Sequence, residues 1–476
     1  MQLLSQGSQN IFLIGNPSIT FFKTVYKRHT NFAIDTVQEF FDGQINFGQR
    51  VKCKLSKNGD LLSKIGMYIK LSNLNKKKKY NSCSKLHSTR NKEKLDDELL
   101  SKQSSNFSSE VDMHKNKFTE CLCTCSKCLF NEKNEDIIYG WANSIGHVLL
   151  EWIEIYIGGQ LIDRHYGEWL EIWTELTQTA EKRLGYYEMI GKKDPLAYTV
   201  DSFTENMELY VPFNFWFCRN IGLAIPVLSL IHHDIEFIVK IRDFDGCWVC
   251  NKPNAPKPNA LIYACILADY IYLSLEERHK FYTESHLYLI DQLQLNENNY
   301  SNCNSGSINI ELEFNHPVKE MIWFIQRTDV LGPANGVWPE DCSYPKGNDH
   351  FNFTTARVPR LAKLRETFSC AKLQLSGTDR TSNWPASYFR LWQNYYYHTR
   401  IPTANYLYTY SFSLAPEDHQ PSGTCNMSVV DNARLCIKLI PKRKVCEKYP
   451  IRCKIYAVNY QLLLITSGMG SVLFYN

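Results

Sequence analysis

The sequence predicts an all-β protein built from antiparallel β-sandwiches, and three observations support this prediction. First, apolar and polar residues alternate in many short runs, which is the period of a strand with one buried face. Second, the chain contains 28 Tyr and 25 Phe, aromatic residues that favour pleated strands over helices. Third, helical patterns are sparse, and turn signals such as those at 58–60 and 158–159 separate the alternating runs.

The alternating runs occur in both halves of the chain. Ile153, Ile155 and Ile157 share one face of a predicted strand, because Glu154 and Tyr156 separate them. The same period recurs further along the chain, at 308–314, 371–377 and 433–440. Two runs are more fully apolar and predict buried strands, at 207–217 and 321–326.

Two segments predict helices. Residues 165–184 carry apolar residues at helical spacing, namely Trp169, Ile172, Leu176 and Leu184. Residues 274–282 predict a short helix, and a new alternating series begins near Leu287, so we interpret this helix as the joint between two halves. A chain of 476 residues exceeds one ordinary core, so we expect two domains or one large domain in two parts.

Residues 75–136 interrupt the strand pattern. The segment is polar, carries charges of both signs and has few large apolar residues, so it cannot build a core. It lies between two strand-like runs, 61–72 and 148–157. We therefore predict that 75–136 is a Cys- and Lys-rich loop insertion.

Four cysteines crowd the end of this insertion, at Cys121, Cys123, Cys125 and Cys128. Four thiolates this close together could hold Zn²⁺. A usual zinc site instead takes two separated pairs, and the C-x-C steps strain the tetrahedral geometry. A reduced, oxidisable loop without metal is therefore the favoured interpretation, and zinc at this cluster is the only cofactor that the sequence suggests.

Charge and cysteine content argue against some classes of function. The chain has 53 basic and 49 acidic residues and a net charge of +4, whereas a protein that coats DNA would be far more basic. The 17 cysteines, an odd number, are scattered along the chain, which indicates reduced, buried thiols in a protein made in the cytosol. We find no signal peptide and no membrane-spanning segment, and we expect a soluble protein.

Catalytic motifs are missing from the sequence. It contains no GxGxxG, Walker A, HExxH or GxSxG pattern, so we do not expect an enzyme. Asp163, His165 and Glu168 lie close together along the chain and could suit a metal ion or an acid–base pair. A hydrogen-bonded polar turn is the favoured interpretation of these three residues.

The N-terminal stretch 15–33, GNPSITFFKTVYKRHTNFA, mixes aromatic and basic side chains. The candidate site residues in it are Phe21, Phe22, Lys23, Tyr26, Lys27, Arg28 and Phe32. Four interpretations are open: a nucleic-acid patch, a membrane-surface segment, a clamp onto another protein chain, or packing on its own subunit. The low net charge argues against nucleic acid as the main partner.

This stretch closely resembles the N-terminal signature of the major capsid proteins of nucleocytoplasmic large DNA viruses, the chlorella-virus and mimivirus-like group. Further blocks similar to that family follow in the expected order, at 153–173, 209–237, 314–326, 374–389, 410–435 and 456–476. The departures are the long insertion, Val429 where Arg is common, and Ser471-Val472 in place of Gly-Leu. These departures leave room for a capsid paralogue with a specialised position.

The resemblance implies a double jelly roll: two eight-stranded antiparallel β-sandwiches side by side, with short helices in the loops. It implies a viral major capsid protein whose homotrimers form pseudo-hexagonal capsomers that tile an icosahedral shell. The implied location is the virion capsid, after synthesis and assembly in the host cytoplasm. The implied partners are the chain itself in trimers and neighbouring capsomers, minor capsid proteins and the inner viral membrane surface, without direct specific binding of nucleic acid.

The resemblance also assigns a role to the N-terminal stretch. We expect an arm at the base of the capsomer, where Phe21, Phe22 and Phe32 dock on protein. We expect Lys27 and Arg28 to pair with acidic groups of a neighbouring subunit or of a minor capsid protein. On this fold the chain divides into the arm at 1–34, the first jelly roll at 35–280 and the second jelly roll at 281–476.

The position of the insertion follows from how the strands are lettered, because connections in a jelly roll alternate between its two ends. We assign strands B, C, D and E to 38–55, 61–72, 148–157 and 207–217. The insertion is then the C–D connection, and the helix-bearing segment 163–205 is the D–E connection. In this family the D–E and F–G connections form the outer tower, so we expect the insertion toward the base or the side.

Two alternative functions are open. A minor capsid paralogue would share the fold but occupy a specialised position. A carbohydrate-binding β-sandwich belongs to a different class, and it would need an exposed aromatic platform or two carboxylates at catalytic separation. Binding of sugars by monomeric protein would distinguish this class from a capsid subunit.

Overall fold

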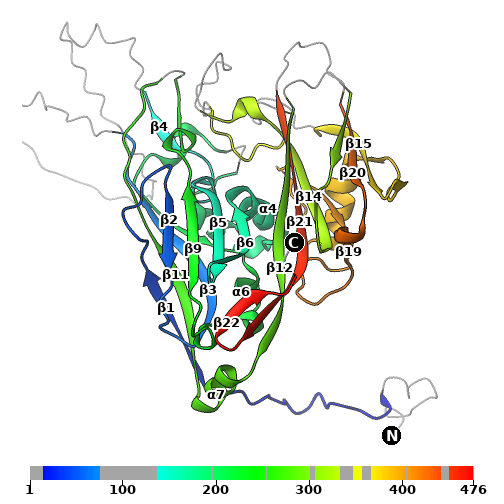
Figure 1. Ribbon diagram of the computed structural model, residues 1–476. Coiled ribbons are helices and arrows are strands. Elements are labelled where there is room, and N and C mark those ends of the chain that lie inside the picture. Colours follow the sequence, from blue (N-terminus) through cyan, green and yellow to red (C-terminus); the bar gives the residue numbers. More distant parts are fainter. Residues whose placement is uncertain are drawn as a thin grey trace, which may run out of the picture.

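The chain folds into two β-sandwiches that stand side by side, and the N-terminal segment projects from one end (Figure 1). A computed structural model describes residues 14–75, 137–194, 197–252, 255–300, 306–332, 347–355, 366–403, 405–440 and 450–474. The cysteine cluster of the insertion, at Cys121, Cys123, Cys125 and Cys128, lies outside the described residues.

The first sandwich has two antiparallel sheets, with strand orders β1-β11-β3-β7 and β2-β9-β5-β6. Its main strands are β1 (Phe32–Glu39), β2 (Arg50–Lys54), β3 (Leu61–Leu71), β5 (Leu150–Ile157), β6 (Gln160–Tyr166), β7 (Met207–Pro212), β9 (Ile235–Ile241) and β11 (Ile262–Leu273). Three short strands add to it, β4 (Tyr139–Trp141), β8 (Ile225–Pro226) and β10 (Trp248–Cys250).

The second sandwich repeats this order, with sheets β12-β21-β14-β18 and β13-β20-β15-β16. Its main strands are β12 (His286–Tyr300), β13 (Ser307–Glu311), β14 (Pro317–Arg327), β15 (Phe368–Leu375), β16 (Thr378–Asp379), β18 (Tyr408–Ser411), β20 (Ala433–Leu439) and β21 (Ile451–Thr466). Three short strands add to it, β17 (Trp384–Pro385), β19 (Cys425–Asn426) and β22 (Met469–Val472).

Both sandwiches are jelly rolls. When the main strands of each are lettered B to I in chain order, the sheets read B-I-D-G and C-H-E-F. The predicted fold class, an all-β double jelly roll, is therefore confirmed. The predicted strand face of Ile153, Ile155 and Ile157 is also confirmed, because all three side chains lie in the core of the first jelly roll.

Helices occupy the connections between strands. They are α3 (Ile145–Val148), α4 (Gly167–Thr177), α5 (Ala180–Ile190), α6 (Trp216–Arg219), α7 (Leu275–Thr283) and α8 (Gln393–Tyr397). Single turns of tighter or wider helix add to them, η4 (Val200–Phe203), η5 (Ile221–Leu223), η6 (Val227–Ser229), η7 (Phe244–Gly246), η8 (Thr328–Val330), η9 (Tyr388–Trp392) and η10 (Met427–Val429). The predicted short helix over 274–282 is confirmed as α7, which joins the two jelly rolls.

The helix predicted over 165–184 was wrong in its length. Gln178 and Thr179 adopt extended backbone and divide the segment into α4 and α5. Threonine has a low helix propensity, and the Thr177 hydroxyl turns back onto the carbonyl of Trp173 (2.8 Å). Leu184, which the helical spacing placed on the buried face, is exposed on α5 as a result.

Helix α4 fills the junction between the two jelly rolls (Figure 1). Its apolar stripe at helical spacing consists of Trp169, Ile172, Trp173 and Leu176. This stripe packs on β14 and β21 of the second jelly roll, through Ile322, Phe324, Tyr456 and Val458. Leu170, on the other side of the helix, joins the core of the first jelly roll, so α4 belongs to both cores.

Buried ion pairs accompany this packing. Glu168 of α4 accepts hydrogen bonds from Arg452 (2.5 Å) and Lys454 (2.6 Å), both on β21 of the second jelly roll. Burial alone would raise the pKa of Glu168, but Arg452 and Lys454 outweigh it and lower the pKa to about 2. Glu168 therefore stays ionised and links the two jelly rolls electrostatically.

The remaining carboxylates of α4 pair with groups of the first jelly roll and, at Glu175, also with the second jelly roll. Lys192 donates to Glu171 (2.5 Å) and also to Glu175, while His147 contacts the second oxygen of Glu171 at 2.7 Å. Arg400 of the second jelly roll reaches Glu175 at 3.2 Å. Each of the three buried glutamates of α4 thus faces at least one positively charged side chain.

A second contact between the jelly rolls surrounds His350. The Nε2–H group of His350 donates to the carbonyl of Gly246 in the first jelly roll (2.7 Å). Asn348 donates to the carbonyl of Trp248 at 2.7 Å. Burial, together with the nearby charge of Arg242, lowers the pKa of His350 to about 3. The imidazole is therefore neutral and bound to the first jelly roll at physiological pH.

The strand register places the arm and the insertion at opposite ends of the first jelly roll. Phe32, where the arm joins β1, pairs with Leu273 at one end of β11, whereas Leu71, just before the insertion, pairs with Ile262 at the other end. We call these the arm end and the far end. Two hydrogen bonds between Asn75 and the backbone of Tyr139, at 2.8 and 3.0 Å, close the neck of the insertion.

The prediction that the insertion is the C–D connection was wrong. The insertion is the D–E connection and the segment with α4 and α5 is the F–G connection, so both leave the sandwich at the far end. The predicted lettering fails because 38–55 is not one strand but spans the end of β1 and all of β2. The backbone turns between β1 and β2, with positive φ at Gly43 and Gly48, and the two strands belong to different sheets.

We predict that Glu168→Ala strongly destabilises the protein, because Arg452 and Lys454 would stay buried without their shared carboxylate. The free energy of unfolding should fall by about 3–5 kcal/mol, the usual range when one partner of a buried ion pair is removed. Thermal and denaturant unfolding measure this change. Glu311→Ala is the matched control, since Glu311 pairs with Arg434 on the exposed surface (3.0 Å). Equal effects of both substitutions would contradict the role of Glu168.

We predict that His350 makes the protein less stable as the pH falls. The unfolded chain takes up a proton near the ordinary histidine pKa of 6.5, whereas folded His350 does so only at about 3. Within this window the unfolded state binds more protons, so His350 lowers stability by about 1.4 kcal/mol per pH unit. The unfolding midpoint, followed from about pH 7.5 to about pH 5.5, should fall less steeply in His350→Gln. The exposed control His232→Gln should leave this slope unchanged. The same unchanged slope in His350→Gln would refute the prediction.

Candidate functional site

The N-terminal arm is an extended segment that runs outside the two jelly rolls (Figure 1). Its described part, residues 14–31, is exposed along its whole length. Phe21 and Phe22 expose 91% and 99% of their surface, values that are extreme for phenylalanine. Hydrogen bonds within the arm are local, for example from the Phe22 amide to the Thr20 hydroxyl (3.3 Å).

All the candidate residues of the arm share this exposure. Lys23, Tyr26, Lys27, Arg28 and Phe32 join Phe21 and Phe22 on the solvent-facing surface. None of these seven side chains lies in a hydrophobic core of the described chain. Their aromatic and basic groups are therefore available to another surface.

The strand that follows the arm is also open on one side. Among the strands of the described residues, β1 pairs with β11 alone and ends its sheet, so its other edge is an open sheet edge there. Ile34 exposes about half of its surface beside Phe32. Arm and edge strand together form one continuous unsatisfied surface at the side and arm end of the first jelly roll.

A second exposed aromatic surface lies in the second jelly roll, in its F–G connection. We call residues 384–396 the aromatic loop; its exposed members are Trp384, Leu391, Trp392, Tyr395 and Tyr396. The rings of Trp392 and Tyr396 pack against each other in a tilted arrangement, with 4.9 Å between ring centroids. Trp and Tyr are enriched in protein–protein interfaces because they bury a large area with few rotatable bonds.

The aromatic loop faces outward because its polar residues are the anchored ones. Asn394 is buried and accepts a hydrogen bond from the hydroxyl of Thr409 on β18 (2.7 Å). Gln393 is also buried and accepts from the backbone N–H of Ser411 (3.2 Å). The sequence did not predict this surface. Where aromatic residues alternate with Gln and Asn, the aromatic side chains are usually expected in the core and the amide side chains on the surface.

Asp163, His165 and Glu168 do not form a joint site. Asp163 pairs with His165 (Oδ2 to Nε2, 3.0 Å) and accepts from the backbone N–H of Leu293 (3.0 Å). The His165 ring stacks on Phe215, and Glu168 turns toward the second jelly roll. The three side chains are hydrogen-bonded as expected, but the predicted turn was wrong, because Asp163 and His165 lie on strand β6 and Glu168 lies on helix α4.

Five of the nine cysteines in the described ranges are buried, and the other four are partly buried. Burial raises the pKa of Cys247 to about 12, and its Sγ–H donates to the carbonyl of Asp243 (3.4 Å). Cys250, two residues beyond Trp248, is buried as well and donates to the carbonyl of Lys252. Within the described ranges, no three His, Cys, Asp or Glu side chains are grouped closely enough to hold a metal ion.

One further feature concerns membranes. Among the helices of the described residues, none has both the length and the apolar character needed to cross a bilayer.

Comparison with known proteins identifies the family. Residues 20–274 match the family described as major capsid protein N-terminus, and residues 277–471 match the family described as large eukaryotic DNA virus major capsid protein. The major capsid protein of Pyramimonas orientalis virus is 33% identical, over 100% of this chain and 99% of the relative. That of Chrysochromulina ericina virus is 30% identical, again over 100% of this chain and 99% of the relative.

Solved structures agree with this result. PBCV-1 VP54 superposes with a TM-score of 0.70 at 26% identity, over 96% of this chain and 100% of that chain. The Faustovirus major capsid protein shares the fold, with a TM-score of 0.66 at 11% identity over 97% of this chain and 95% of that chain. The two family matches, the full-length relatives and the strand order together show that the chain belongs to the major capsid protein family of large eukaryotic DNA viruses.

Proposed function

We propose that this chain is a structural subunit of an icosahedral virion shell, and that three copies assemble into a pseudo-hexagonal capsomer. The observation that carries the proposal is the repetition of one strand order, B-I-D-G and C-H-E-F, in two jelly rolls side by side. Three copies of a two-roll chain present six similar sandwiches around one axis. A solved structure with a TM-score of 0.68 at 26% identity belongs to the PBCV-1 virus capsid.

The exposed surfaces suit self-association rather than catalysis. In a closed ring of three, each subunit offers two different surfaces, one to each neighbour. The arm with its edge strand β1 and the aromatic loop are two such surfaces on different jelly rolls. The small net charge of +4 lets identical subunits approach without strong mutual repulsion. No enzymatic step and no cofactor is part of this proposal.

The orientation of the subunit in the shell follows from its two ends. The insertion and the helix-bearing F–G connection share the far end of the first jelly roll, while the arm leaves from the opposite end. We assign the far end to the outer surface of the capsomer, and the arm end to its base. Lys27 and Arg28 of the arm then face neighbouring subunits, minor capsid proteins or the inner viral membrane surface.

Synthesis in the host cytoplasm is part of the same proposal. Cys53 and Cys453 are buried in strands of the two jelly rolls, and burial raises the pKa of both thiols. Protonated thiols inside a core are stable in a reducing compartment and serve there as small apolar side chains. A chain that folds around such residues is suited to a reducing cytoplasm.

The solution mass of the purified protein tests the proposal. The chain has a mass of 55.4 kDa, and light scattering behind a sizing column should show a stable species of three times this mass. A monomer at the same concentrations would contradict the trimeric capsomer. It would favour the carbohydrate-binding alternative, for which the aromatic loop would be the platform, and binding of oligosaccharides to the monomer would then be measured.

The aromatic loop should contribute to the trimer. We predict that Trp392→Ala combined with Tyr396→Ala weakens trimer formation at least about tenfold, since central Trp and Tyr residues dominate interface energies. Dilution of the trimer, followed by mass photometry, measures the change. Met469→Ala is the control, because Met469 is a half-exposed apolar residue of β22 outside the loop. A trimer of unchanged affinity would remove the aromatic loop from the interface.

A further inference from the structure

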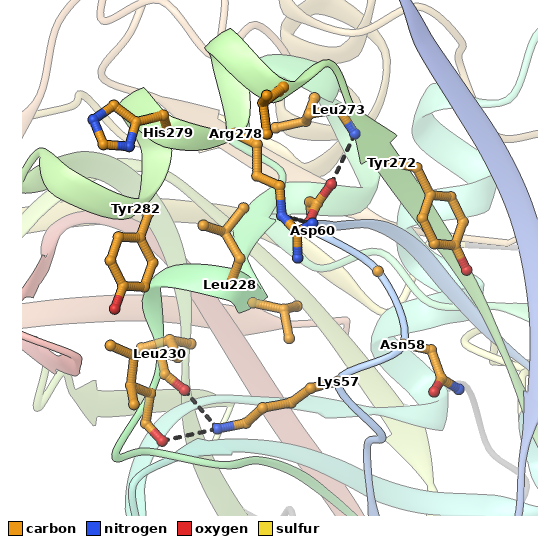
Figure 2. A pocket seen from close by; sticks show the side chains of 14 residues that line it. Lys57, Asn58, Asp60, Leu228, Leu230, Tyr272, Leu273, Arg278, His279 and Tyr282 are labelled. Carbon is orange, nitrogen blue, oxygen red and sulfur yellow. Dashed lines mark hydrogen bonds and ion pairs between the residues drawn. The ribbon is translucent and has the colours of Figure 1, made fainter.

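A pocket opens at the arm end of the first jelly roll, beside α7 (Figure 2). Its walls come from the loop at 57–60, the segment 227–231, the end of β11 and helix α7. The pocket has a volume of about 840 Å³, which is within the range of sites that hold a ligand or a group of side chains. We call it the α7 pocket.

Apolar side chains dominate this pocket. Leu228, Leu230 and Leu273 line its interior, and Leu275 and Tyr282 of α7 stand at its rim. Leu275 exposes 82% of its surface, although a leucine on a helix that packs beside a pocket would ordinarily be covered. Exposed apolar residues gathered around one hollow indicate that another surface covers it.

The charged groups of the pocket are already satisfied. The ammonium group of Lys57 donates to the carbonyls of Leu230 (2.6 Å) and Ile231 (3.2 Å). Arg278 pairs with Asp60 at 3.0 Å, and Asp60 also accepts from the backbone N–H of Leu273 (2.8 Å). Figure 2 shows these contacts along the walls. An apolar group that enters the pocket therefore leaves no charge without its partner.

The arm carries apolar groups of the right kind. Phe21 and Phe22 are adjacent, almost fully exposed, and outside every core of the described chain. A phenylalanine buries roughly 150–250 Å² when it is covered, so both side chains have a strong tendency to leave water. The arm also brings Lys23 and Lys27, and exposed carboxylates lie on α7 at Glu276 and directly after it at Glu284.

The course of the arm points to the pocket of another copy. The arm joins β1 at Phe32, which pairs with Leu273 on the wall of the pocket, and from there it runs away from α7 (Figure 1). Residues 23–31 contain neither Gly nor Pro and include the β-branched Thr24, Val25 and Thr30, which favours extended backbone over a tight reversal. Ten extended residues carry the Phe pair as far as roughly 33 Å from its own pocket.

We propose that Phe21 and Phe22 of each copy dock in the α7 pocket of the next copy in the ring. This proposal rests on the trimer proposed above, and it identifies the site where the arm binds. Each subunit gives one arm and receives one, which is the exchange of an identical element between protomers. Three such exchanges close the ring and leave no pocket and no arm unused.

A photo-crosslinker at position 22 tests this assignment in the full chain. Phe22 is replaced by p-benzoyl-phenylalanine, the trimer is confirmed by light scattering, and the sample is irradiated and separated under denaturing conditions. We expect covalent dimers between chains. Mass spectrometry should identify the crosslinked peptides as ones that contain residues 227–231 or 272–282. A crosslink to the same peptides within one chain would show that the arm folds back, and would overturn the exchange.

A pair of surface substitutions controls this experiment. Leu275→Asp places a charge at the rim of the pocket and should reduce the interchain crosslink at least about fivefold, without change in the unfolding midpoint. Leu261→Asp is the matched control, since Leu261 is equally exposed, at 79%, beside the other end of β11. It should leave the crosslink unchanged.

The outcomes separate this inference from the proposed function. A trimer whose crosslinks map away from the α7 pocket would overturn the inference and leave the capsomer standing. A chain that stays monomeric would contradict both. The irradiation is repeated with vesicles of phosphatidylcholine and phosphatidylserine, and transfer of the crosslink from protein to lipid would assign the arm to a membrane surface instead.

Discussion

The architecture depends on keeping charge inside the junction of the two jelly rolls. Helix α4 carries three buried glutamates, and each would be costly to bury without a positively charged neighbour. Glu168 finds its partners on β21 of the second jelly roll, at Arg452 and Lys454. Separating a buried carboxylate from its partner costs far more free energy than separating an ion pair at the surface. The contacts of Glu168 therefore favour one relative position of the two jelly rolls.

Much of the fold could be predicted from the sequence, because alternation of apolar and polar residues is a local signal. Strands such as β5 and β20 were found in this way, and α7 was found from its helical run. The order of strands in a sheet is not encoded in local sequence. The division of 38–55 into β1 and β2, for example, depends on which sheet each strand joins. The buried glutamates of α4 were equally hidden, since on a helix a charged residue ordinarily marks the solvent face. The partners of Glu168, Arg452 and Lys454, lie almost three hundred positions away.

The candidate site shows the same division between local and distant information. The arm could be predicted because aromatic and basic residues are concentrated in one continuous stretch. The structure adds that Phe21 and Phe22 are almost fully exposed to solvent. The aromatic loop was not predicted, because the outward direction of Trp392 depends on hydrogen bonds that Asn394 and Gln393 accept from strand β18. The α7 pocket is built from four segments of the first jelly roll and the joint. No single stretch of sequence could indicate it.

The neck of the insertion has a consequence for how this chain can change over evolution. Asn75 and Tyr139 bind each other at the point where the long segment leaves and returns, so both of its ends are fixed to the jelly roll. The entropy of closing a loop grows only slowly with its length, and the fold therefore places little restriction on what is inserted there. This position can acquire or lose sequence while the strands of both jelly rolls stay the same. It is also where a foreign peptide could be grafted for display.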